Sequence, residues 1–379
     1  MAAARGTTGP VRVAAADVLA HRVRVQQLDR EAGTVEETAV LDLGVQDSGA
    51  DGALWALANR GVTTAGLPGE RLVAAWTVRG APHWYRREDL PSVAAAVAPW
   101  SHADAAKRIY DAATPLRAAG IGVLDALDEV AAVMRRVVTA PTVKGEVSAA
   151  LTAALPAPYL RDCRPCGARH AYEQPFRLAA LRAGLVLQPG TSPPVLEPVP
   201  GLAPAAEPEP RHDLVRAVLH LLGPVTPTQV AGYVDAPVAE VKARWPDDAV
   251  PVEVHGQRRW VLADDRDGLS AGPVAGVRLL GPFDLLLQAR DRPTLVADPA
   301  RAKALWPVLG RPGAVLVDGR LAGLWRPRAS GGRLGVAVEP WEPLTAAAQA
   351  GVRVQAERLA AHRGVRLTGV TGLGEGSPA

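Results

Sequence analysis

Residues 226–231 read Thr226-Pro227-Thr228-Gln229-Val230-Ala231, and with the amphipathic stretch before them they decide the fold class that this sequence predicts. The apolar residues of 212–222 recur at helical spacing, so a first helix is expected there. Thr226 is a preferred N-cap residue and Pro227 suits the first helical position, which together start a second helix. A third helix is expected over 238–245.

Two alternating segments, 250–254 and 259–262, flank His255-Gly256-Gln257 in the pattern of a β-hairpin. Three helices followed by a hairpin is the order of a winged helix. We therefore predict such a unit over residues 201–272.

A winged helix of this kind would place its third helix in a DNA major groove, with Lys242 and Arg244 on it. The hairpin would bring Arg258 and Arg259 to the phosphates. Winged helices also serve as protein-interaction modules, and Glu240 in the same helix would repel DNA. The pattern alone leaves both interpretations open.

The N-terminal part repeats this order. Helices are expected over 11–30 and 34–43, a third runs through Trp55, and strands at 71–78 and 82–85 follow. Residues 101 to about 187 repeat the theme less regularly, with helices expected over 103–113, 123–138, 142–155 and 175–183. The segment that follows, 188–210, is so rich in proline that we expect an extended connector.

From Val277 onward the pattern becomes largely β, and turns between short strands are typical of a small barrel or sandwich. Asp318-Gly319 suits a tight turn, a closing helix is expected over 343–361, and the tail after Leu367 is expected to be disordered. The expected strands are 277–280, 285–287, 294–297, 314–317, 321–326 and 334–338. An exposed hairpin with Arg326, Arg328 and Arg333 could enter a minor groove or simply remain solvated.

The predicted fold is thus α+β, with tandem winged-helix units and a C-terminal small β-barrel. The expected domains are a first winged helix (1–100), a second with the proline-rich connector (101–200), a third (201–272), a barrel with its closing helix (273–364) and a disordered tail (365–379).

A polar turn, Leu43-Gly44-Val45-Gln46-Asp47-Ser48-Gly49, lies between two expected helices. The side chains of Gln46 and Asp47 could orient a water molecule or a base edge. Alternatively, Asp47 or Ser48 caps the helix that begins near Asp51, because Asp and Ser are preferred N-cap residues.

The composition is that of a folded protein, with 48% hydrophobic and 21% charged residues in 379 residues, which is enough for two to four compact units. The net charge of +3 comes almost wholly from arginine, since only four residues are lysines. Arginine suits phosphate, but GC-rich coding also enriches it, so the charge is weak evidence for a nucleic-acid partner. No apolar run could span a bilayer and no signal-peptide pattern is present, which predicts a cytoplasmic protein.

Cys163-Arg164-Pro165-Cys166 has the spacing of half a zinc site, and His170 follows four residues later. No second Cys-x-x-Cys and no obvious fourth ligand are present, so two free thiols in a turn is the alternative. No metal and no cofactor are predicted.

Three segments in matching order resemble the AlkZ and YcaQ group of winged-helix DNA glycosylases, over about residues 11–364. They are Leu43-Gly44-x-Gln46-Asp47, Trp76-Thr77-x-Arg79-Gly80-x-x-His83, and Leu280-x-Pro282-Phe283-Asp284 with the later Val317-Asp318-Gly319-Arg320-x-x-Gly323-x-Trp325-Arg326. The resemblance implies tandem winged helices on a β-barrel scaffold, a concave DNA-binding surface and removal of alkylated purines.

The same resemblance implies that a Gln-x-Gln or Gln-x-Asp motif orients the attacking water, which assigns Gln46 and Asp47 as catalytic candidates. Gly44 stands where the first glutamine of the motif belongs. Arg79 and His83 match residues that would contact phosphate or line the site, although His83 could equally be structural. Gln27-Leu28-Asp29 has the literal motif but lies outside the matching turn.

We therefore predict a monofunctional DNA glycosylase that acts on bulky N7-alkylated purines or interstrand crosslinks, in DNA repair or genotoxin self-resistance. Its expected partner is damaged double-stranded DNA, bound by a monomer with no membrane association. The alternatives are a non-catalytic DNA-binding protein, such as a regulator or damage-binding protein, and a protein-binding scaffold.

Overall fold

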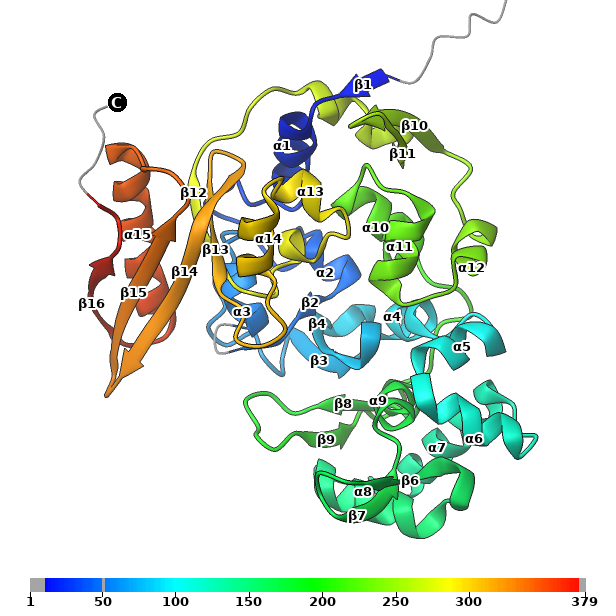
Figure 1. Cartoon of the computed structure of the whole chain (residues 1–379). Coiled ribbons are helices and arrows are strands. Elements are labelled where there is room, and N and C mark those ends of the chain that lie inside the picture. Colours follow the sequence, from blue (N-terminus) through cyan, green and yellow to red (C-terminus); the bar gives the residue numbers. More distant parts are fainter. Residues whose placement is uncertain (1–10, 50–51, 375–379) are drawn as a thin grey trace, which may run out of the picture.

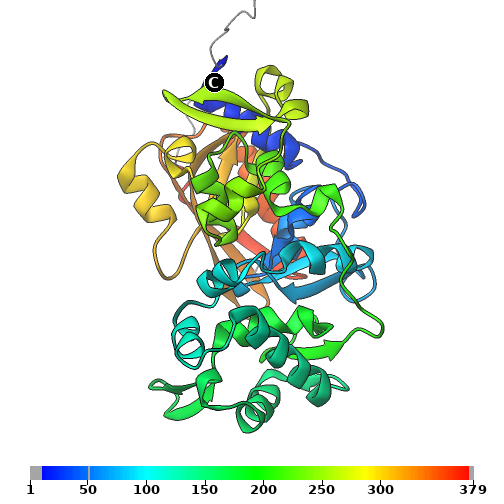
Figure 2. The same cartoon turned by 90° about the vertical axis from the view of Figure 1, so that its right-hand side faces the viewer.

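The computed structural model describes residues 11–49 and 52–374, which form a mixed α+β fold (Figures 1 and 2). The described residues contain sheets of three, five, six and two strands. One hydrophobic core joins parts of the chain that the sequence assigns to separate domains, because it contains Leu43, Leu127, Leu219 and Leu280 together. No helix in the described part of the chain is long and apolar enough to cross a membrane.

A six-stranded sheet lies at the centre of the molecule, in the order β2-β4-β3-β8-β9-β5. The predicted hairpin of β3 and β4 is confirmed, with Ala75 opposite His83. The proline-rich segment is extended as predicted, but part of it pairs with β8 as strand β9. Residues 1–100 and 101–200 therefore share one sheet. The strands are β2 (Val45–Gln46), β3 (Leu72–Trp76), β4 (Pro82–Arg86), β5 (Thr142–Val143), β8 (Leu185–Leu187) and β9 (Val195–Pro198).

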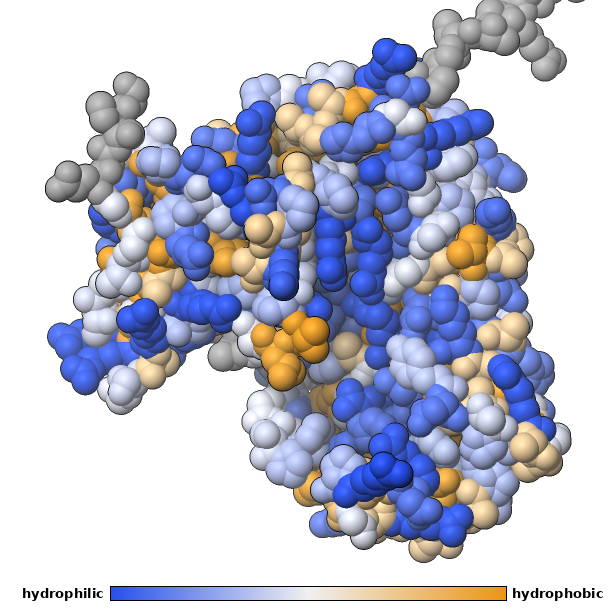
Figure 3. Space-filling model, viewed as in Figure 1, coloured by the Kyte–Doolittle hydropathy of each residue, from blue (hydrophilic) through white to orange (hydrophobic). Residues whose placement is uncertain are grey.

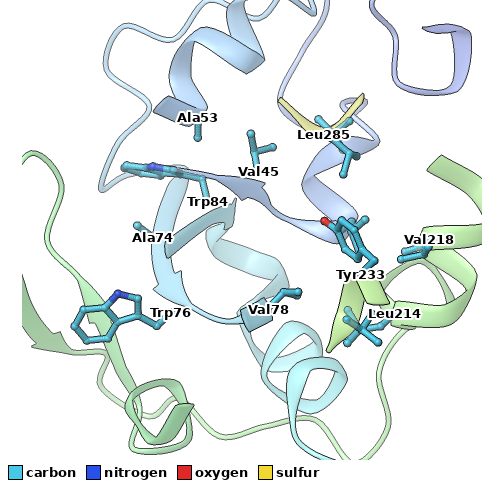
Figure 4. Close-up of a cluster of buried hydrophobic side chains, with 14 of the residues drawn as sticks. Val45, Ala53, Ala74, Trp76, Val78, Trp84, Leu214, Val218, Tyr233 and Leu285 are labelled. Carbon is cyan, nitrogen blue, oxygen red and sulfur yellow. The ribbon is translucent and has the colours of Figure 1, made fainter. Parts of the chain in front are cut away.

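The core beneath this sheet mixes strand and helix side chains (Figure 4). Val45, Ala74 and Trp84 come from β2, β3 and β4, while Leu214 and Tyr233 come from helices far along the chain. All are buried. Their packing fixes the end of β2, where Gln46 lies.

Helices form most of the second segment and lie in the lower part of Figure 1. Their amphipathic patterns predict most of them, although the expected helix over 103–113 is divided and that over 142–155 begins as strand β5. They are α5 (His102–Arg108), α6 (Ala113–Ala118), α7 (Val123–Val137), α8 (Lys144–Ala154) and α9 (Glu173–Arg182), with the two-stranded hairpin of β6 (Leu160–Cys163) and β7 (Ala168–Ala171); α4 (Leu90–Val97) precedes them at the end of the first segment.

The third segment has the predicted order of elements. Helix α11 begins at Pro227, and a capping box joins Thr226 and Gln229, so each side chain accepts a bond from the other's backbone N–H. His255 and Gly256 have φ of 52° and 71°, as a tight hairpin turn requires. The elements are α10 (Leu214–Leu222), α11 (Pro227–Val234), α12 (Val238–Ala243), β10 (Ala249–Val254) and β11 (Gln257–Leu262).

The prediction of a helix over 11–30 is wrong at its start. Val11–Val13 form strand β1, which pairs in parallel with β10, and helix α1 covers only Ala15–Val25. Val-Arg-Val alternates as a strand does. Arg12 lies opposite Glu253 in the register and forms an ion pair with it at 3.0 Å.

The expected helix over 34–43 reduces to α2 (Val40–Leu43), because other groups take its backbone carbonyls. The buried Arg86 guanidinium donates to the carbonyls of Val35 and Thr38 at 2.9 and 2.8 Å. The Thr38 hydroxyl donates to the carbonyl of Thr34. Such contacts favour turns over helix. Helix α3 (Gly52–Ala58) is confirmed at Trp55.

The C-terminal sheet is open and curled into a half-barrel, in the order β12-β13-β14-β15-β16, whereas the sequence predicts a small β-barrel. Its edge strands β12 and β16 do not pair within 277–371. Helix α15 packs on it through a core that includes Trp55 and Trp325. The elements are β12 (Val277–Leu280), β13 (Gly313–Val317), β14 (Arg320–Ser330), β15 (Arg333–Pro340), α15 (Ala346–His362) and β16 (Arg366–Thr371).

Three predictions in this region are wrong. Leu285–Gln288 form a 3-10 turn in place of a strand, because the Asp284 carboxylate accepts a bond from the Leu286 N–H at 3.1 Å. Residues 292–295 form helix α13 (Arg292–Leu295), with Pro293 near its start, and α14 (Pro299–Leu305) follows. The sequence predicts a disordered tail, but β16 pairs with β15; residues 375–379 lie outside the described residues.

Candidate functional site

Gln46 ends the short strand β2, opposite His83 in β4. Its amide is held at both ends: Nε2 donates to Ser48 Oγ at 3.0 Å, and Oε1 accepts from Arg79 Nη2 at 3.3 Å. An amide fixed in this way presents the remaining lone pair of its oxygen in one direction. It can orient a water molecule, as a catalytic amide must.

Arg79 links Gln46 to two later parts of the chain. Its guanidinium donates to Gln288 Oε1 at 2.6 Å and to the Tyr233 carbonyl at 2.5 Å, and it stacks 4.9 Å from the centre of the Tyr233 ring. Its φ of 58° lies in the left-handed region, which directs the side chain out of the β3–β4 turn. Gln46, Arg79 and Gln288 therefore form one polar cluster.

A cavity of about 180 Å³ opens beside this cluster. Four arginines line it, together with both glutamines and two aromatic rings, and its lining contains no acidic residue. Arg292 stacks on Trp306 and Arg311 on Phe283, at 4.9 and 5.3 Å from the ring centres. The arginines are Arg79, Arg290, Arg292 and Arg311.

The positive charge of this cavity is not neutralised by direct ion pairs in the described part of the chain. Within residues 11–49 and 52–374, none of its four arginines forms an ion pair with an acidic side chain. Partial removal from water lowers the pKa of Arg290, and the charges of Arg79 and Arg292 lower it further, against a smaller opposite effect of Asp235. Burial, and then the charges of Arg292 and Arg79, likewise lower the pKa of Arg311. Uncompensated guanidinium groups of this kind fit phosphate.

Asp47 lies beside Gln46 but does not line the cavity. Its Oδ1 accepts a hydrogen bond from the Ala53 N–H at 3.0 Å, at the start of α3. Its backbone N–H donates to the Pro82 carbonyl at 2.8 Å. The structure therefore shows a capping contact for Asp47, which is the alternative that the sequence also allows.

Gly44 cannot be replaced by glutamine without rearrangement. Its φ is +85°, and a Cβ added there would lie 2.4 Å from Tyr85 Cζ. The Tyr85 hydroxyl is hydrogen bonded to Thr77 Oγ1 at 2.8 Å. The place of the first motif glutamine is thus filled by a buried tyrosine, and Gln46 is the one glutamine of this turn.

His83 is fully buried, which argues against the predicted contact with DNA. Its Nδ1 lies 3.0 Å from both Thr77 Oγ1 and the Ala81 carbonyl oxygen. Burial, and then the charge of Arg79, lower its pKa to about 3. His83 is a neutral residue that supports the turn beneath Arg79.

Of the basic residues that the sequence predicts to contact DNA in residues 201–272, two are bound within the chain and two are exposed. Arg259 is buried, and it shares the Asp291 carboxylate with Arg22 at 2.6 and 2.8 Å, so it is not available to phosphate. Arg244 is bound by Glu240 at 2.8 Å and stacks on Trp100. Lys242 and Arg258 are exposed.

Arg326, Arg328 and Arg333 are exposed on β14 and β15, as predicted. These strands form the long hairpin that projects at the lower left of Figure 1. Arg326 donates to the Gly310 carbonyl at 2.7 Å, which connects the hairpin to the loop before β13.

Neither a motif nor a periodic pattern identifies Gln288, Arg290, Arg292 and Arg311 as site residues. A signal exists in the sequence, because Gln288-Ala289-Arg290-Asp291-Arg292 directly follows a buried leucine run and the Phe283-Asp284 pair. The apolar run predicts a strand, and nothing in a strand pattern marks its polar end as a site. Asp284 itself is structural, since it forms a fully buried ion pair with Arg60 at 2.8 Å.

Two groups of side chains have the composition of metal sites. Asp42, Asp89 and His212 lie close together, but the guanidinium of Arg86 binds both carboxylates at 2.6 and 2.9 Å. In the other group, Cys163, Cys166 and His170 lie at the β6–β7 turn. Hydrogen bonds from Cys166 and His170 lower the pKa of Cys163 to about 6.

Comparisons with known proteins identify the fold and the family of the chain. A search of curated proteins by sequence finds no match. Among solved structures, the Streptomyces sahachiroi DNA glycosylase AlkZ has the same fold, with a TM-score of 0.69 and 22% identity over 95% of this chain and 100% of that chain. The family model described as DNA glycosylase AlkZ-like matches residues 35–362. The chain therefore belongs to the family of AlkZ-like DNA glycosylases.

Proposed function

We propose that this protein is a monofunctional DNA glycosylase that hydrolyses the N-glycosidic bond of bulky N7-alkylated purines in duplex DNA, in repair or genotoxin self-resistance. The position of Gln46 is the observation that carries the proposal. Its side-chain amide is held by Ser48 and Arg79, and it lines a cavity with four arginines that form no ion pair among the described residues. The family membership of the chain supports the reaction class.

The chemistry suits this set of residues. An N7-alkylated purine carries a positive charge that weakens its glycosidic bond, so the base leaves readily and strong general-base catalysis is not required. Gln46 Oε1 would accept a hydrogen bond from the water that attacks the anomeric carbon. The arginines would hold the flanking phosphates, which keep the negative charge of the backbone beside the developing oxocarbenium ion.

A monofunctional mechanism fits the lining of the cavity. A glycosylase that also cleaves the strand needs an amine to attack the sugar, as lysine does in Schiff-base chemistry. No lysine is among the described residues that line this cavity. Water is therefore the nucleophile in our proposal, and the product is an intact strand with an abasic site.

We further propose that α10–α12 with β10 and β11 act as a winged helix against DNA. Glu240 is bound to Arg244 and accepts from the Ser101 hydroxyl at 2.6 Å, so this face of α12 is occupied within the chain. Lys242 and Arg258 would contact phosphates. Such contacts position the protein on the duplex and do not recognise bases. Arg326, Arg328 and Arg333 would follow the minor groove, with the protein bound as a monomer.

The test uses duplexes that carry one N7-alkylguanine, with adducts of increasing size. After incubation with purified protein, mild base and heat cleave the strand at any abasic site. We expect cleavage at the modified guanine alone, and none without the base treatment. Absence of abasic product with every adduct, together with retained salt-sensitive binding, would replace this proposal by a non-catalytic damage-binding protein.

A further inference from the structure

The loop between α14 and β13 presents two apolar side chains to solvent. Val308 and Leu309 are 94% and 85% exposed, far more than any other large apolar residue in the described ranges 11–49 and 52–374. Figure 3 shows a hydrophobic patch surrounded by hydrophilic surface, near where Figure 1 draws this loop. Adjacent apolar side chains with a polar rim are typical of interaction sites.

The loop is held in place by its surroundings. Trp306 Nε1 donates to the Leu287 carbonyl at 3.0 Å, and Arg326 donates to the Gly310 carbonyl at 2.7 Å. Pro307 and Pro312 restrict the backbone on either side. Val308 and Leu309 are therefore presented by a braced loop.

The loop also borders the proposed active site. Trp306 before the two apolar residues and Arg311 after them both line the cavity that contains Gln46. The apolar tip is thus flanked by guanidinium groups that fit phosphate. A surface that combines an apolar projection with arginines is complementary to a DNA base stack and its backbone, and its place beside the Gln46 cavity favours DNA as the partner.

We propose that Val308 and Leu309 form a wedge that enters the base stack next to the damaged nucleotide and occupies the space it leaves when it turns into the cavity. This inference rests on the proposed glycosylase function. Apolar wedges of this type separate base steps and compensate for the disrupted stacking. Extrusion of the nucleotide gives Gln46 access to the anomeric carbon.

The test combines a structural and a kinetic readout. A duplex carries 2-aminopurine beside an N7-alkylguanine, and binding of the unaltered protein is expected to raise its fluorescence. The double variant Val308→Ala with Leu309→Ala is expected to lose this rise and to excise from duplex about 10-fold more slowly. On a single strand with the same adduct the two proteins are expected to differ by less than about 2-fold, because no stack must be opened. Val354→Ala on α15 is the matched control, since Val354 is 52% exposed and distant in sequence from the site.

The possible results distinguish failure of the wedge proposal from failure of the glycosylase proposal. Equal fluorescence and equal duplex rates for both proteins would overturn the wedge and leave the glycosylase proposal standing. Equal losses on duplex and single strand would also overturn it, because they indicate damage to the site itself. If no abasic product forms with either protein, the proposed function fails, and fluorescence alone then decides whether the wedge opens the stack.

A second inference comes from the β6–β7 hairpin. The ligand atoms of Cys163, Cys166 and His170 all lie within 4.8 Å of one another. Arg161 is opposite His170 in the register, and Cys163 is two residues after Arg161, so Cys163 and His170 share one face of the hairpin. The sequence predicts no metal here for want of a fourth ligand, but the fold brings three ligands together.

The geometry points to one zinc ion bound by these three side chains, with water in the fourth position. Two thiolates and one imidazole are the ligands that Zn²⁺ prefers. Most of the hairpin is exposed or half-buried, so it has little core of its own, and a bound metal would stabilise its turn.

Metal content tests this directly. Protein prepared without chelator and under reducing conditions is expected to contain about one equivalent of zinc, and Co²⁺ is expected to give thiolate charge-transfer absorbance. Cys163→Ser, Cys166→Ser and His170→Asn are each expected to abolish both signals, while His255→Asn, an exposed histidine elsewhere, leaves them unchanged. No metal after reconstitution with zinc, or signals that survive the cysteine variants, would overturn the proposal.

Discussion

Arg79 Nη2 donates to Gln46 Oε1 at 3.3 Å and, at the same time, to Gln288 Oε1 at 2.6 Å. One guanidinium thus joins the polar end of β2 to the turn after the buried leucine run. The orientation of Gln46 depends on this contact, since its amide could otherwise rotate. Arg79 is therefore a positioning residue for the proposed water-orienting amide.

Arg79→Lys should slow excision although it preserves the charge, because an ammonium group lacks the planar fork that holds both glutamines and the Tyr233 carbonyl and that stacks on the Tyr233 ring. We expect a single-turnover rate about 10-fold lower, and about 100-fold lower for Arg79→Ala. Arg353→Ala on α15 is the control, because Arg353 is exposed and lies outside the cavity. A lysine variant as fast as the unaltered protein would show that the fork is not needed.

Restoring the missing glutamine should not improve the enzyme. Gly44→Gln places a Cβ 2.4 Å from Tyr85 Cζ at a φ of +85°. We expect a decrease of about 2–4 kcal/mol in the free energy of unfolding, from overpacking and backbone strain. Denaturant unfolding measures it. Normal stability together with faster excision would mean that Tyr85 moves aside and that a second amide helps catalysis.

Two substitutions of Asp47 distinguish a helix-capping role from a catalytic role. Asp47→Asn keeps an acceptor oxygen for the Ala53 N–H, whereas Asp47→Ala removes it. We expect the alanine variant to lose about 1 kcal/mol of stability and the asparagine variant much less. The excision rate of Asp47→Asn should stay within about 5-fold of the unaltered protein, since neutral amides serve in this chemistry. A large drop in rate with unchanged stability would instead make Asp47 the base.

Buried neutral histidines should make the fold sensitive to acid. Burial lowers the pKa of His83 to about 3 and that of His21 to about 4, from an ordinary value of 6.5. Between the folded and the ordinary pKa values the unfolded chain binds more protons, so stability is complete above about pH 6.5 and falls as the pH decreases toward 4. Each histidine contributes at most about 1.4 kcal/mol per pH unit. Denaturant unfolding at pH 7, 6 and 5 checks this, and a flat profile would contradict it.

The cavity arginines should contribute to DNA affinity by neutralising phosphates. Arg292→Ala should weaken binding of all duplexes alike and reduce the slope of log affinity against log salt by about 0.9 for each phosphate that is no longer neutralised. Arg259→Ala should behave differently, because Arg259 is buried against Asp291. We expect it to lower stability and leave the slope unchanged. Equal salt slopes for Arg292→Ala and the unaltered protein would remove this residue from the interface.

Local signals in the sequence are enough to predict several elements. The capping box at Thr226 and the turn at His255-Gly256 are set by residues within four positions of each other, and both are observed. The run Leu285–Leu287 cannot be assigned in this way, because a short apolar run fits a strand or a buried turn equally. The capping oxygen of Asp284 decides between them.

The site is only partly predictable. A motif points to Gln46 and Arg79, and the structure brings them together with Gln288, Arg290 and Arg311, which lie more than 200 positions later in the sequence. A periodic pattern cannot predict contacts between residues so far apart in the sequence. His83 and Arg259 show the opposite error, because a basic residue looks the same in sequence whether it faces DNA or a buried partner such as Thr77 or Asp291.

The role of Gln46 is tested by comparing Gln46→Ala and Gln46→Glu with the unaltered protein on a duplex with one N7-alkylguanine. The abasic product is measured in single turnover, with the melting temperature as the control for folding. We predict that Gln46→Ala binds the duplex normally, melts normally and forms abasic sites about 100-fold more slowly, while Gln46→Glu retains more of the rate because it keeps an acceptor oxygen. Excision at the full rate by Gln46→Ala would contradict this role for Gln46 and place the water-orienting group elsewhere in the cavity.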